Sequence, residues 1–281
     1  MIGSVVLREL ESSGVSVWTT DRRSLDRPQH VVADLNDPNA VTRLVETDCD
    51  AVIHLSGAVA GDPYDLFTSN VLATVRLLDG LPRGSRIVMA GSAAEYGEGE
   101  GKAISESHPL RPVSPYGWAK VAQSSVAQSI AGRRDHQLTI VRPFNVVAPD
   151  LPATTALGNM RSQLTGPNTD GTISVGRLDV VRDYVSVDFV ASVFCAAAVD
   201  PNGPPVLNAC SGVGLRLHDV LDAMIEILGV DVSVTADPGL ANLSAASIVV
   251  GDPAATVDRY GIASRPDASS IAGVALGVTT E

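Results

Sequence analysis

One tyrosine and one lysine stand at a spacing that allows acid–base chemistry. Tyr116 and Lys120 belong to the run Tyr-Gly-Trp-Ala-Lys, so a helix would place both side chains on one face, one turn apart. An ammonium group beside a phenol favours the phenolate and lowers the phenol pKa from its usual value of about 10. We therefore expect Tyr116 to exchange a proton with a carbonyl or carbinol oxygen. The alternative is an ordinary surface pair, although lysine occurs in this chain only at Lys102 and Lys120.

A serine follows an apolar run upstream of this pair. Residues 88–91, Val-Met-Ala-Gly, have the character of a buried strand that ends just before Ser92. Groups beyond the carboxyl ends of parallel strands face the ligand in this type of sheet. We expect the Ser92 hydroxyl to hydrogen-bond the oxygen that Tyr116 protonates, whereas the alternative is a serine that only forms a turn. No histidine in the sequence is a plausible partner for Ser92, so a hydrolase triad is not predicted.

The elements that position these residues alternate between two patterns. Short β-branched apolar runs predict buried parallel strands at 15–18, 30–33, 51–55, 86–90 and 138–142. Helical patterns separate them, at 4–13, 40–46, 66–78 and 116–132. The alternation predicts an α/β fold with a doubly wound, Rossmann-like parallel sheet. His54 lies inside an apolar strand and is expected to be a satisfied core histidine.

The pattern changes after Pro149. Residues 150–175 are rich in glycine and proline and predict a mobile segment over a site, whereas 217–228 predicts an amphipathic helix. We expect a dinucleotide-binding domain and a smaller C-terminal substrate-binding lobe. The first would span 1–149 with 177–205 returning to it, and the second would span 150–176 and 206–281.

Composition and charge narrow the class of protein. With 20 Lys+Arg and 32 Asp+Glu the net charge is −12, which disfavours nucleic acid and anionic membranes as partners. The three cysteines, Cys49, Cys195 and Cys210, share no metal or redox spacing, so no metal site is predicted and a reducing compartment is favoured. The apolar run at 190–199 is too short for a membrane span, and charges from Arg8 onward leave no signal-peptide core. We therefore expect a cytoplasmic protein.

A set of motifs extends along nearly the whole chain. It includes Asp-Ala-Val-Ile-His-Leu-Ser-Gly at 50–57, Gly91–Gly97, Ser-Pro-Tyr at 114–116 with Lys120, Val-Arg-Pro-Phe-Asn at 141–145, Arg-Asp-Tyr-Val-Ser-Val-Asp at 182–188 and Asn-Ala-Cys-Ser-Gly at 208–212. In order and spacing this set resembles the extended short-chain dehydrogenases/reductases that act on nucleotide sugars. Residues 91–97 and 175–187 resemble in particular the branch that reduces nucleotide-4-keto-6-deoxyhexoses.

The resemblance implies roles for individual residues. The catalytic residues would be Ser92, Tyr116 and Lys120. The cofactor-binding residues would be Gly3, Asp21, Arg22, Asp34, Leu35, Leu55, Ser56, Gly57, Asn70 and Pro143, together with Tyr116 and Lys120. The substrate contacts would be Glu95, Asn145 and Arg182, whose guanidinium could grip a diphosphate. The implied cofactor is NAD, since Asp21 suits a ribose 2′-hydroxyl, with NADP as the alternative that Arg22 and Arg23 would favour. The resemblance also implies a homodimer, formed through the helices at 66–78 and 116–132.

The chain departs from this family at two places. Sugar dehydratases of the family carry an acidic residue two positions after the catalytic serine or threonine, where this chain has Ala94, so dehydration is not expected. The run Met1–Ser4 resembles only the end of the family's glycine-rich turn, and the central strand before that turn is missing. A start assigned too late, a truncation or loss of the cofactor would each explain this. We expect weak NAD(H) binding by the chain as it stands, with 269–280 as the only spare segment to fill the sheet.

Three functions are compatible with these motifs. The favoured function is reduction of the 4-keto group of a nucleotide-activated 6-deoxyhexose by NAD(P)H. A nucleotide-sugar 4-epimerase with tightly held NAD would use the same three catalytic residues. A cofactor-free protein that only binds a sugar nucleotide or a partner is the third, and the incomplete glycine-rich turn supports it.

Overall fold

The computed structural model describes residues 1–281 except 38, 100, 167–170, 238, 240–246 and 279–281. One of its two four-stranded sheets is entirely parallel, with the strand order β3-β4-β5-β9. The bounds of these strands are Ala51–His54, Arg86–Ala90, Gln137–Pro143 and Val206–Ala209. No helix among the described residues is long and apolar enough to cross a membrane.

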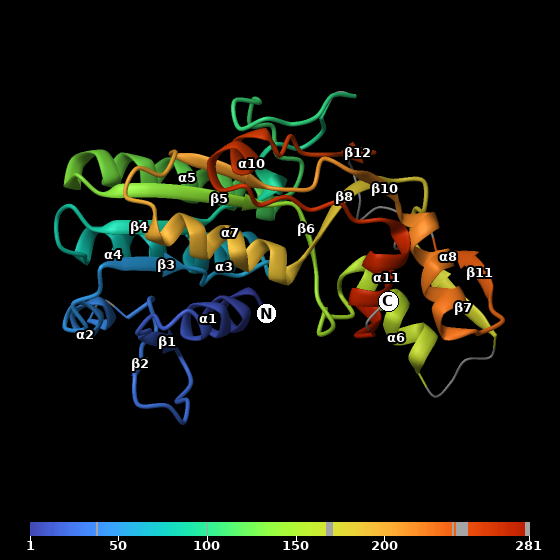
Figure 1. The fold of residues 1–281 in the computed structure, drawn as a ribbon, viewed down its shortest axis with the longest axis horizontal. Coiled ribbons are helices and arrows are strands. Elements are labelled where there is room, and N and C mark those ends of the chain that lie inside the picture. The colour runs from blue at the N-terminus through green and yellow to red at the C-terminus, as the bar shows by residue number, and fades with distance from the viewer. Residues whose placement is uncertain (38, 100, 167–170, 238, 240–246, 279–281) are drawn as a thin grey trace.

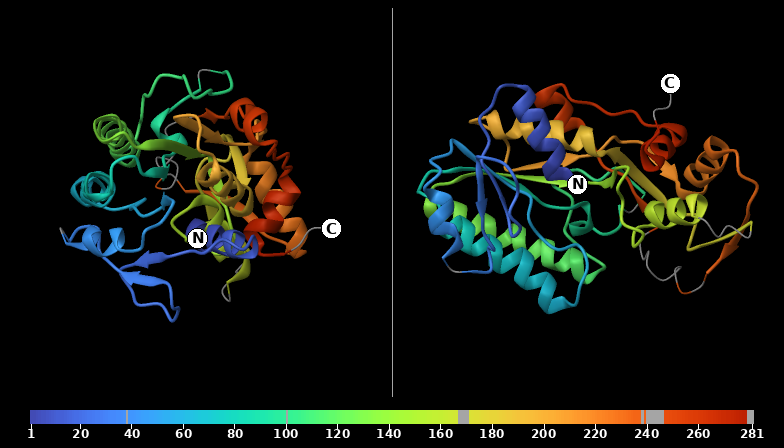
Figure 2. Two further views of the ribbon diagram at one scale, coloured as in Figure 1. Left: turned by 60° about the vertical axis from the view of Figure 1, so that its left-hand side comes forward. Right: turned by 90° about the horizontal axis from the view of Figure 1, so that it is seen from below.

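Helices cover both faces of this sheet, as the right-hand view of Figure 2 shows. The helices are α1 (Ile2–Ser12) and α7 (Val187–Val199) on one face, and α4 (Ala73–Gly80) and α5 (Pro115–Arg134) on the other. The central strands β4 and β5 are apolar because both of their faces are covered: Ile87, Val88 and Met89 are fully buried. The predicted doubly wound, Rossmann-like sheet is confirmed.

The segment before α4 is helical but not uniform. It consists of α3 (Pro63–Phe67) and a π-helical stretch, η1 (Thr68–Leu72), that leads into α4. The sequence predicts one helix over this region, and the π-helical turn inside it was not predicted. Such turns place side chains out of the α-helical register and occur often at functional sites.

The prediction of a strand at 15–18 is wrong. Residues 13–15 complete the end of α1, because Ser13 and Val15 donate backbone hydrogen bonds to the carbonyl of Leu10. The first strand, β1, is Thr19–Asp21 and pairs in parallel with β2, His30–Val32. The small helix α2 (Ala40–Val45) follows these two strands.

The parallel sheet is divided into two pieces. The β1–β2 pair forms its own two-stranded sheet, and β3 is an edge strand of the larger one. Among the described strands none pairs with the second edge of β1 or with the free edge of β3. Figure 1 shows β1 and β2 lying beyond β3 and α1. The discontinuity therefore falls where the family resemblance predicts a missing central strand.

The segment proposed to fill this discontinuity lies elsewhere. Within it, α11 (Ala268–Leu276) packs against α8 (Leu217–Leu228), at the far end of the molecule in Figure 1. Ile271, Ala272 and Ala275 are buried there in an apolar core. The expectation for 269–280 is therefore wrong for its described residues, and 279–280 lie outside them.

The second lobe has its own small sheets. The pairing order is β10-β8-β12 with β6 on β8, and β7 pairs with β11. The strand bounds are Asn145–Val147 (β6), Thr172–Val175 (β7), Val181–Ser186 (β8), Gly214–Arg216 (β10), Ser233–Ala236 (β11) and Ile248–Val249 (β12). The helices α6 (Ala156–Thr165), α8 and α11 surround these strands. Residues 150–175 thus contain α6 and β7, and Leu157, Met160 and Ile173 are buried in the core of this lobe.

The two lobes exchange segments more often than the sequence predicts. The predicted boundary placed 206–281 in the second lobe, but β9 pairs with β5 and completes the larger parallel sheet. The helix α10 (Ala254–Tyr260) then packs on β9, so the chain returns to the first lobe a second time. The sequence also predicts that 177–205 belongs to the first lobe. Strand β8, which lies within this segment, instead pairs with β10 and β12 of the second lobe.

Candidate active site

Ser92 follows β4 and caps the short helix η2, Ala93–Glu95. Its hydroxyl accepts from the backbone N–H of Ala94 at 3.1 Å, and its own N–H donates to Glu95 Oε1 at 2.9 Å. This reciprocal capping box satisfies two backbone donors that would otherwise lack partners. The Ser92 hydroxyl is therefore held at the carboxyl end of the central strand.

Tyr116 is brought to Ser92 by the close approach of α5 to η2. Helix α5 begins at Pro115, and the Ser114 hydroxyl accepts from the backbone N–H of Gly117. A Cβ at Gly117 would lie 2.5 Å from the carbonyl oxygen of Ala94, so only glycine allows this contact. Here the Ser92 hydroxyl is close enough to the Tyr116 phenol to lower the pKa of that phenol by hydrogen bonding.

The Tyr116 phenol keeps its proton more strongly than the sequence predicts. Burial raises its pKa, the hydrogen bond from Ser92 opposes the rise, and the negative charge of Glu95 adds to it. The Lys120 ammonium donates to Gln123 and, at 2.6 Å, to the carbonyl oxygen of Ala90, and it is not among the groups that shift the Tyr116 pKa. The prediction that Lys120 lowers the Tyr116 pKa is therefore wrong, and the phenol of Tyr116 is protonated at neutral pH.

Lys120 is buried, with 4% of its surface exposed. Burial lowers its pKa to about 8, and the charge of Glu95 works against this fall. Its ammonium is held at the carboxyl end of β4, one helical turn from Tyr116. A lysine in this position can bind hydroxyl groups of a ligand and titrates close to neutral pH.

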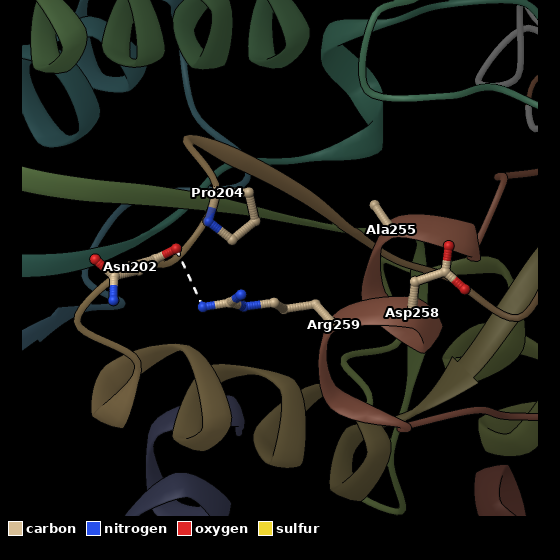
Figure 3. Close-up of a pocket in the computed structure, with 5 residues that line it drawn as sticks. All are labelled: Asn202, Pro204, Ala255, Asp258 and Arg259. Carbon is tan, nitrogen blue, oxygen red and sulfur yellow. Dashed lines mark hydrogen bonds between the residues drawn. The ribbon is translucent and has the colours of Figure 1, made fainter.

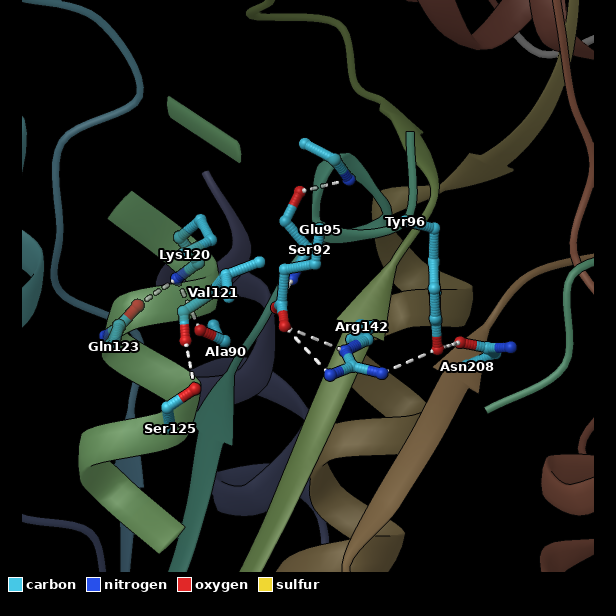
Figure 4. Close-up of polar contacts among 11 residues, drawn as sticks. Ala90, Ser92, Glu95, Tyr96, Lys120, Val121, Gln123, Ser125, Arg142 and Asn208 are labelled. Atoms are coloured by element: carbon cyan, nitrogen blue, oxygen red, sulfur yellow. Dashed lines mark hydrogen bonds and ion pairs between the residues drawn. The ribbon is translucent and has the colours of Figure 1, made fainter. Parts of the chain in front are cut away.

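Glu95 lies behind Ser92 and not on the surface of a substrate site. It is fully buried, and its carboxylate forms an ion pair with Arg142 at 2.9 Å. Arg142 also donates to the Tyr96 hydroxyl, which donates to Asn208 Oδ1, both at 2.8 Å (Figure 4). The guanidinium carbon of Arg142 lies 4.7 Å from the centre of the Tyr96 ring.

This network corrects the prediction that Glu95 contacts the substrate. Its two carboxylate oxygens serve the Ser92 N–H and the Arg142 guanidinium. Sequence reasoning also missed Arg142, Tyr96 and Asn208 as parts of the site. One sequence feature could have indicated this network: Arg142 lies within the apolar run of a central strand, and a buried charge requires a partner.

The predicted cofactor residues near β3 come together at its carboxyl end. Gly3, in the first turn of α1, would place a Cβ 3.7 Å from the Leu55 side chain. Ser56 and Gly57 follow β3 and are exposed. Asn70 is buried beneath them, and its amide donates to the carbonyl oxygens of Ala58 at 2.9 Å and Leu66 at 2.8 Å. Asn70 thus shapes the loop after β3, and its direct contact with a cofactor stays a prediction.

The remaining predicted cofactor residues follow the separate strands β1 and β2. Asp21 ends β1 and accepts from the backbone N–H and the guanidinium of Arg23, which lowers the pKa of the Asp21 carboxyl. Arg22 is exposed, and Asp34 is exposed with its carboxylate bound to the N–H of Asn36. Leu35 packs on the core beneath α4. Of these residues, Asp21, Arg22 and Asp34 lie with the separate β1–β2 pair, whereas Leu35 reaches the core of the larger sheet.

The last predicted site residues lie at the end of β5 and on two strands of the second lobe. Pro143, predicted to bind the cofactor, ends β5. Asn145, predicted to contact the substrate, begins β6, and its amide donates to the carbonyl oxygen of Asp183 at 2.9 Å. Arg182 on β8 is partly buried and donates to the carbonyl oxygens of Val181 and Ser247. Burial lowers its pKa from the usual value.

A surface pocket lies apart from the candidate active site. The pocket in Figure 3 is lined by Asn202, Pro204, Ala255, Asp258 and Arg259, before the amino end of β9. It is therefore at the opposite edge of the sheet from Ser92. Across the described residues, no group of three or more His, Cys, Asp or Glu is arranged to hold a metal ion.

Comparisons with known proteins decide the family. The model of the NAD dependent epimerase/dehydratase family matches residues 1–210. The chain belongs to this family. It is thus an enzyme of the NAD(P)-dependent short-chain dehydrogenase/reductase type that modifies nucleotide sugars.

Individual relatives in the family are distant. The chain is 28% identical to dTDP-6-deoxy-L-talose 4-dehydrogenase (NAD(P)(+)) of Kitasatospora kifunensis, over 84% of this chain and 79% of that protein. It is 26% identical to UDP-glucose 4-epimerase of Azospirillum brasilense, over 83% and 76%. The structure of MoeE5 in complex with UDP-glucose and NAD matches with a TM-score of 0.85 at 26% identity, covering 98% of this chain and 94% of that one. These matches confirm the predicted family and fold.

Proposed function

We propose that this protein reduces the 4-keto group of a nucleotide-activated 6-deoxyhexose with NAD(P)H. The observation that carries the proposal is the close approach of α5 to η2, which brings the Tyr116 phenol to the Ser92 hydroxyl at the carboxyl end of β4. Reduction of a ketone needs a proton donor at the oxygen, and burial keeps Tyr116 in that form. The similarity to a 6-deoxyhexose 4-dehydrogenase supports the choice of substrate class.

In the proposed reaction, Tyr116 and Ser92 have different roles at the reacting oxygen. Bound NAD(P)H would supply the hydride to the sugar C4. Tyr116 donates its proton to the forming alkoxide, and Ser92 hydrogen-bonds the same oxygen. Because the Ser92 backbone is fixed by Glu95, its hydroxyl is preorganised and needs no reorientation during the reaction.

The nicotinamide half of the cofactor fits the groups at the carboxyl ends of β3 and β4. Ser56 and Gly57 are exposed there, and Lys120 offers an ammonium group close to the β4 carbonyl of Ala90. Lys120 would bind the ribose hydroxyls. From the second lobe, Arg182 and Asn145 would hold the diphosphate and the sugar of the substrate.

A stoichiometric assay tests the reduction against its main alternative. Purified protein, NADPH or NADH, and a nucleotide-4-keto-6-deoxyhexose should give one oxidised cofactor for each sugar reduced. A 4-epimerase, which the similarity to UDP-glucose 4-epimerase supports, would interconvert sugars without net consumption of NAD(P)H. Binding of a sugar nucleotide without turnover or cofactor binding would support the cofactor-free alternative and contradict the proposal.

The divided sheet predicts weak binding of NAD(H). A dinucleotide pyrophosphate binds where a central strand turns into the N-terminus of a helix. The described residues place Gly3 in the first turn of α1 but place no strand between β1 and β3. By isothermal titration we expect NADH to bind this chain at least about ten-fold more weakly than the same chain preceded by an apolar strand and a glycine-rich turn, a difference of about 1.4 kcal/mol.

A matched extension controls this comparison. It carries the same strand but has alanines in place of the turn glycines, so it should complete the sheet without admitting the pyrophosphate. Equal dissociation constants for the unextended and the glycine-containing chains would contradict the prediction.

Arg182→Ala should act on substrate binding more than on chemistry. The diphosphate is remote from C4, so its interaction with the guanidinium is similar in the ground state and the transition state. We expect a large rise in KM for the nucleotide sugar with little change in kcat. The control is Arg133→Ala, which removes an exposed arginine at the other end of α5 from Tyr116. An effect of Arg182→Ala confined to kcat would place this residue outside the diphosphate site.

We propose that the protein forms a homodimer through the face made by α3 and the start of α5. Three large apolar side chains are exposed there: Tyr64 (77%), Phe67 (46%) and Trp118 (61%). Adjacent exposed aromatic side chains are typical of protein interfaces. Sedimentation velocity should show a dimer that Trp118→Glu converts to a monomer, whereas Trp18→Glu, on a different exposed face, should leave the dimer intact. A monomeric native protein would contradict the proposal.

A further inference from the structure

One buried hydroxyl stands between two parts of the candidate cofactor site. Thr74 lies at the start of α4, directly after the π-helical segment η1, and is completely buried. Its hydroxyl donates to the carbonyl oxygen of Asn70 at 2.6 Å. A hydroxyl has a single proton, so toward every other neighbour Thr74 is an acceptor.

The first of these neighbours leads to Lys120. Gln123 donates its amide N–H to Thr74 Oγ1 at 2.8 Å, and both side chains are buried. The amide oxygen of Gln123 is then turned toward Lys120, whose ammonium donates to it. Because an ammonium can only donate and Thr74 can here only accept, the orientation of the Gln123 amide is determined at both of its ends.

The second neighbour leads to Ser56. His54 Nε2 lies 2.8 Å from Thr74 Oγ1, and since Thr74 cannot donate to it, Nε2 must carry the imidazole proton. Nδ1 is then unprotonated and accepts from the Ser56 hydroxyl at 3.2 Å. Burial and the charge of Lys120 lower the His54 pKa to about 3, so the ring is neutral and keeps this tautomer.

We propose that Thr74 is a positioning residue of the cofactor site, which orients Lys120 through Gln123 and Ser56 through the tautomer of His54. The proposal rests on the proposed function, which makes Lys120 and Ser56 the groups that meet the nicotinamide half of the cofactor. The chain Ser56–His54–Thr74–Gln123–Lys120 joins the carboxyl end of β3 to α5 through hydrogen bonds whose directions are all fixed. A single hydroxyl thus sets the geometry of two groups on different elements.

The charged and titratable surroundings of Lys120 are few enough for a direct test. Glu95 approaches it from η2 and His54 from β3, and Tyr116 precedes it on α5. The chain has only one other lysine, the exposed Lys102, which serves as an internal reference. Lysine labelled with ¹³C at Cε therefore gives two titration curves in the free protein, and ¹⁵N-labelled histidine reports the tautomer of His54.

Thr74→Val removes the hydroxyl and preserves the shape of the side chain. Without this acceptor the Gln123 amide is no longer held toward Lys120, so we expect the Lys120 midpoint to fall by about one pH unit, as expected for one hydrogen bond to a charged group. We also expect His54 to move its proton to Nδ1, where the Ser56 oxygen can accept it. Thr74→Ser restores the hydroxyl and should restore both signals.

Thr68→Val is the matched control. Thr68 lies in η1, and its buried hydroxyl has no hydrogen-bond partner among the described residues, so the same chemical change should leave both signals at their native positions. If Thr74→Val leaves the His54 tautomer and the Lys120 midpoint unchanged, or if Thr68→Val moves them equally, the proposal is overturned.

Gln123→Glu tests the same contact if Thr74→Val does not fold. A carboxylate beside the ammonium should raise the Lys120 midpoint by at least about one pH unit. An unchanged midpoint would show that residue 123 does not hold Lys120 and would overturn the proposal. None of these readouts needs cofactor or substrate. A protein that gives the expected signals but does not oxidise NAD(P)H would contradict the proposed function alone.

Discussion

Tyr116→Phe should reduce the turnover of nucleotide-4-keto-6-deoxyhexose by at least about 10²–10⁴-fold, the contribution typical of a general acid. The phenol is the proton donor of the proposed reaction, and its raised pKa keeps the proton in place at neutral pH. The ring itself is retained in phenylalanine, so binding of the nucleotide sugar should be unchanged. The measurement is kcat from NAD(P)H consumption, with the dissociation constant of the sugar nucleotide measured separately.

Two further variants serve as a control and a comparison for Tyr116→Phe. Tyr64→Phe removes the same hydroxyl group from an exposed tyrosine on α3 and should retain full activity. Ser92→Ala removes one hydrogen bond to the reacting oxygen and should cost less than Tyr116→Phe, about 1–3 kcal/mol in the activation free energy. A Tyr116→Phe enzyme with native kcat would contradict the mechanism, and a fully active Ser92→Ala enzyme would reassign Ser92 to its capping role.

Glu95→Ala should lower the free energy of unfolding by about 3–5 kcal/mol, because it leaves the Arg142 guanidinium buried without its carboxylate. Arg142 is 3% exposed, and the Tyr96 hydroxyl cannot replace the lost charge. The substitution also removes the acceptor of the Ser92 N–H, so kcat should fall together with stability. Urea unfolding and steady-state kinetics measure the two effects.

The exposed ion pair between Asp79 and Arg133 is a natural control for this experiment. Its side chains are 50% and 66% exposed, so Asp79→Ala should cost less than about 1 kcal/mol. Glu95→Gln keeps an amide oxygen toward the network and should lie between the two. Equal costs for Glu95→Ala and Asp79→Ala would mean that the buried pair contributes no more than a surface one.

Local patterns in the sequence were sufficient to predict Ser92, Tyr116 and Lys120 as neighbours. A strand ending before Ser92 and a helix carrying Tyr116 must meet at the carboxyl end of a parallel sheet, which needs no knowledge of side-chain packing. The direction of the Lys120 side chain could not be predicted in this way. It depends on Ala90 and Gln123, which compete for the ammonium and lie on two different elements.

Burial was the other property that sequence patterns did not reveal. Glu95 is followed by Tyr96 and Gly97 and looks like part of an exposed loop, yet β5 and β9 supply Arg142 and Asn208 to the same network. Those contacts join residues about fifty and more than a hundred positions apart, beyond any local periodicity. For the same reason the sequence did not predict that β9, far along the chain, completes the larger sheet beside β5.

The division of the parallel sheet bears on how the molecule fluctuates. Strands β1 and β2 share hydrogen bonds only with each other among the described strands, so the rest of the sheet does not hold them by backbone pairing. Such a unit opens at a lower free energy than the buried strands β4 and β5, and its amide protons exchange with solvent earlier. Asp21 and Asp34, expected at the adenosine end, belong to this less protected unit. If Asp21 and Asp34 bind the adenosine, its recognition is coupled to the ordering of this small sheet, whereas Ser92 follows a buried central strand of the larger one.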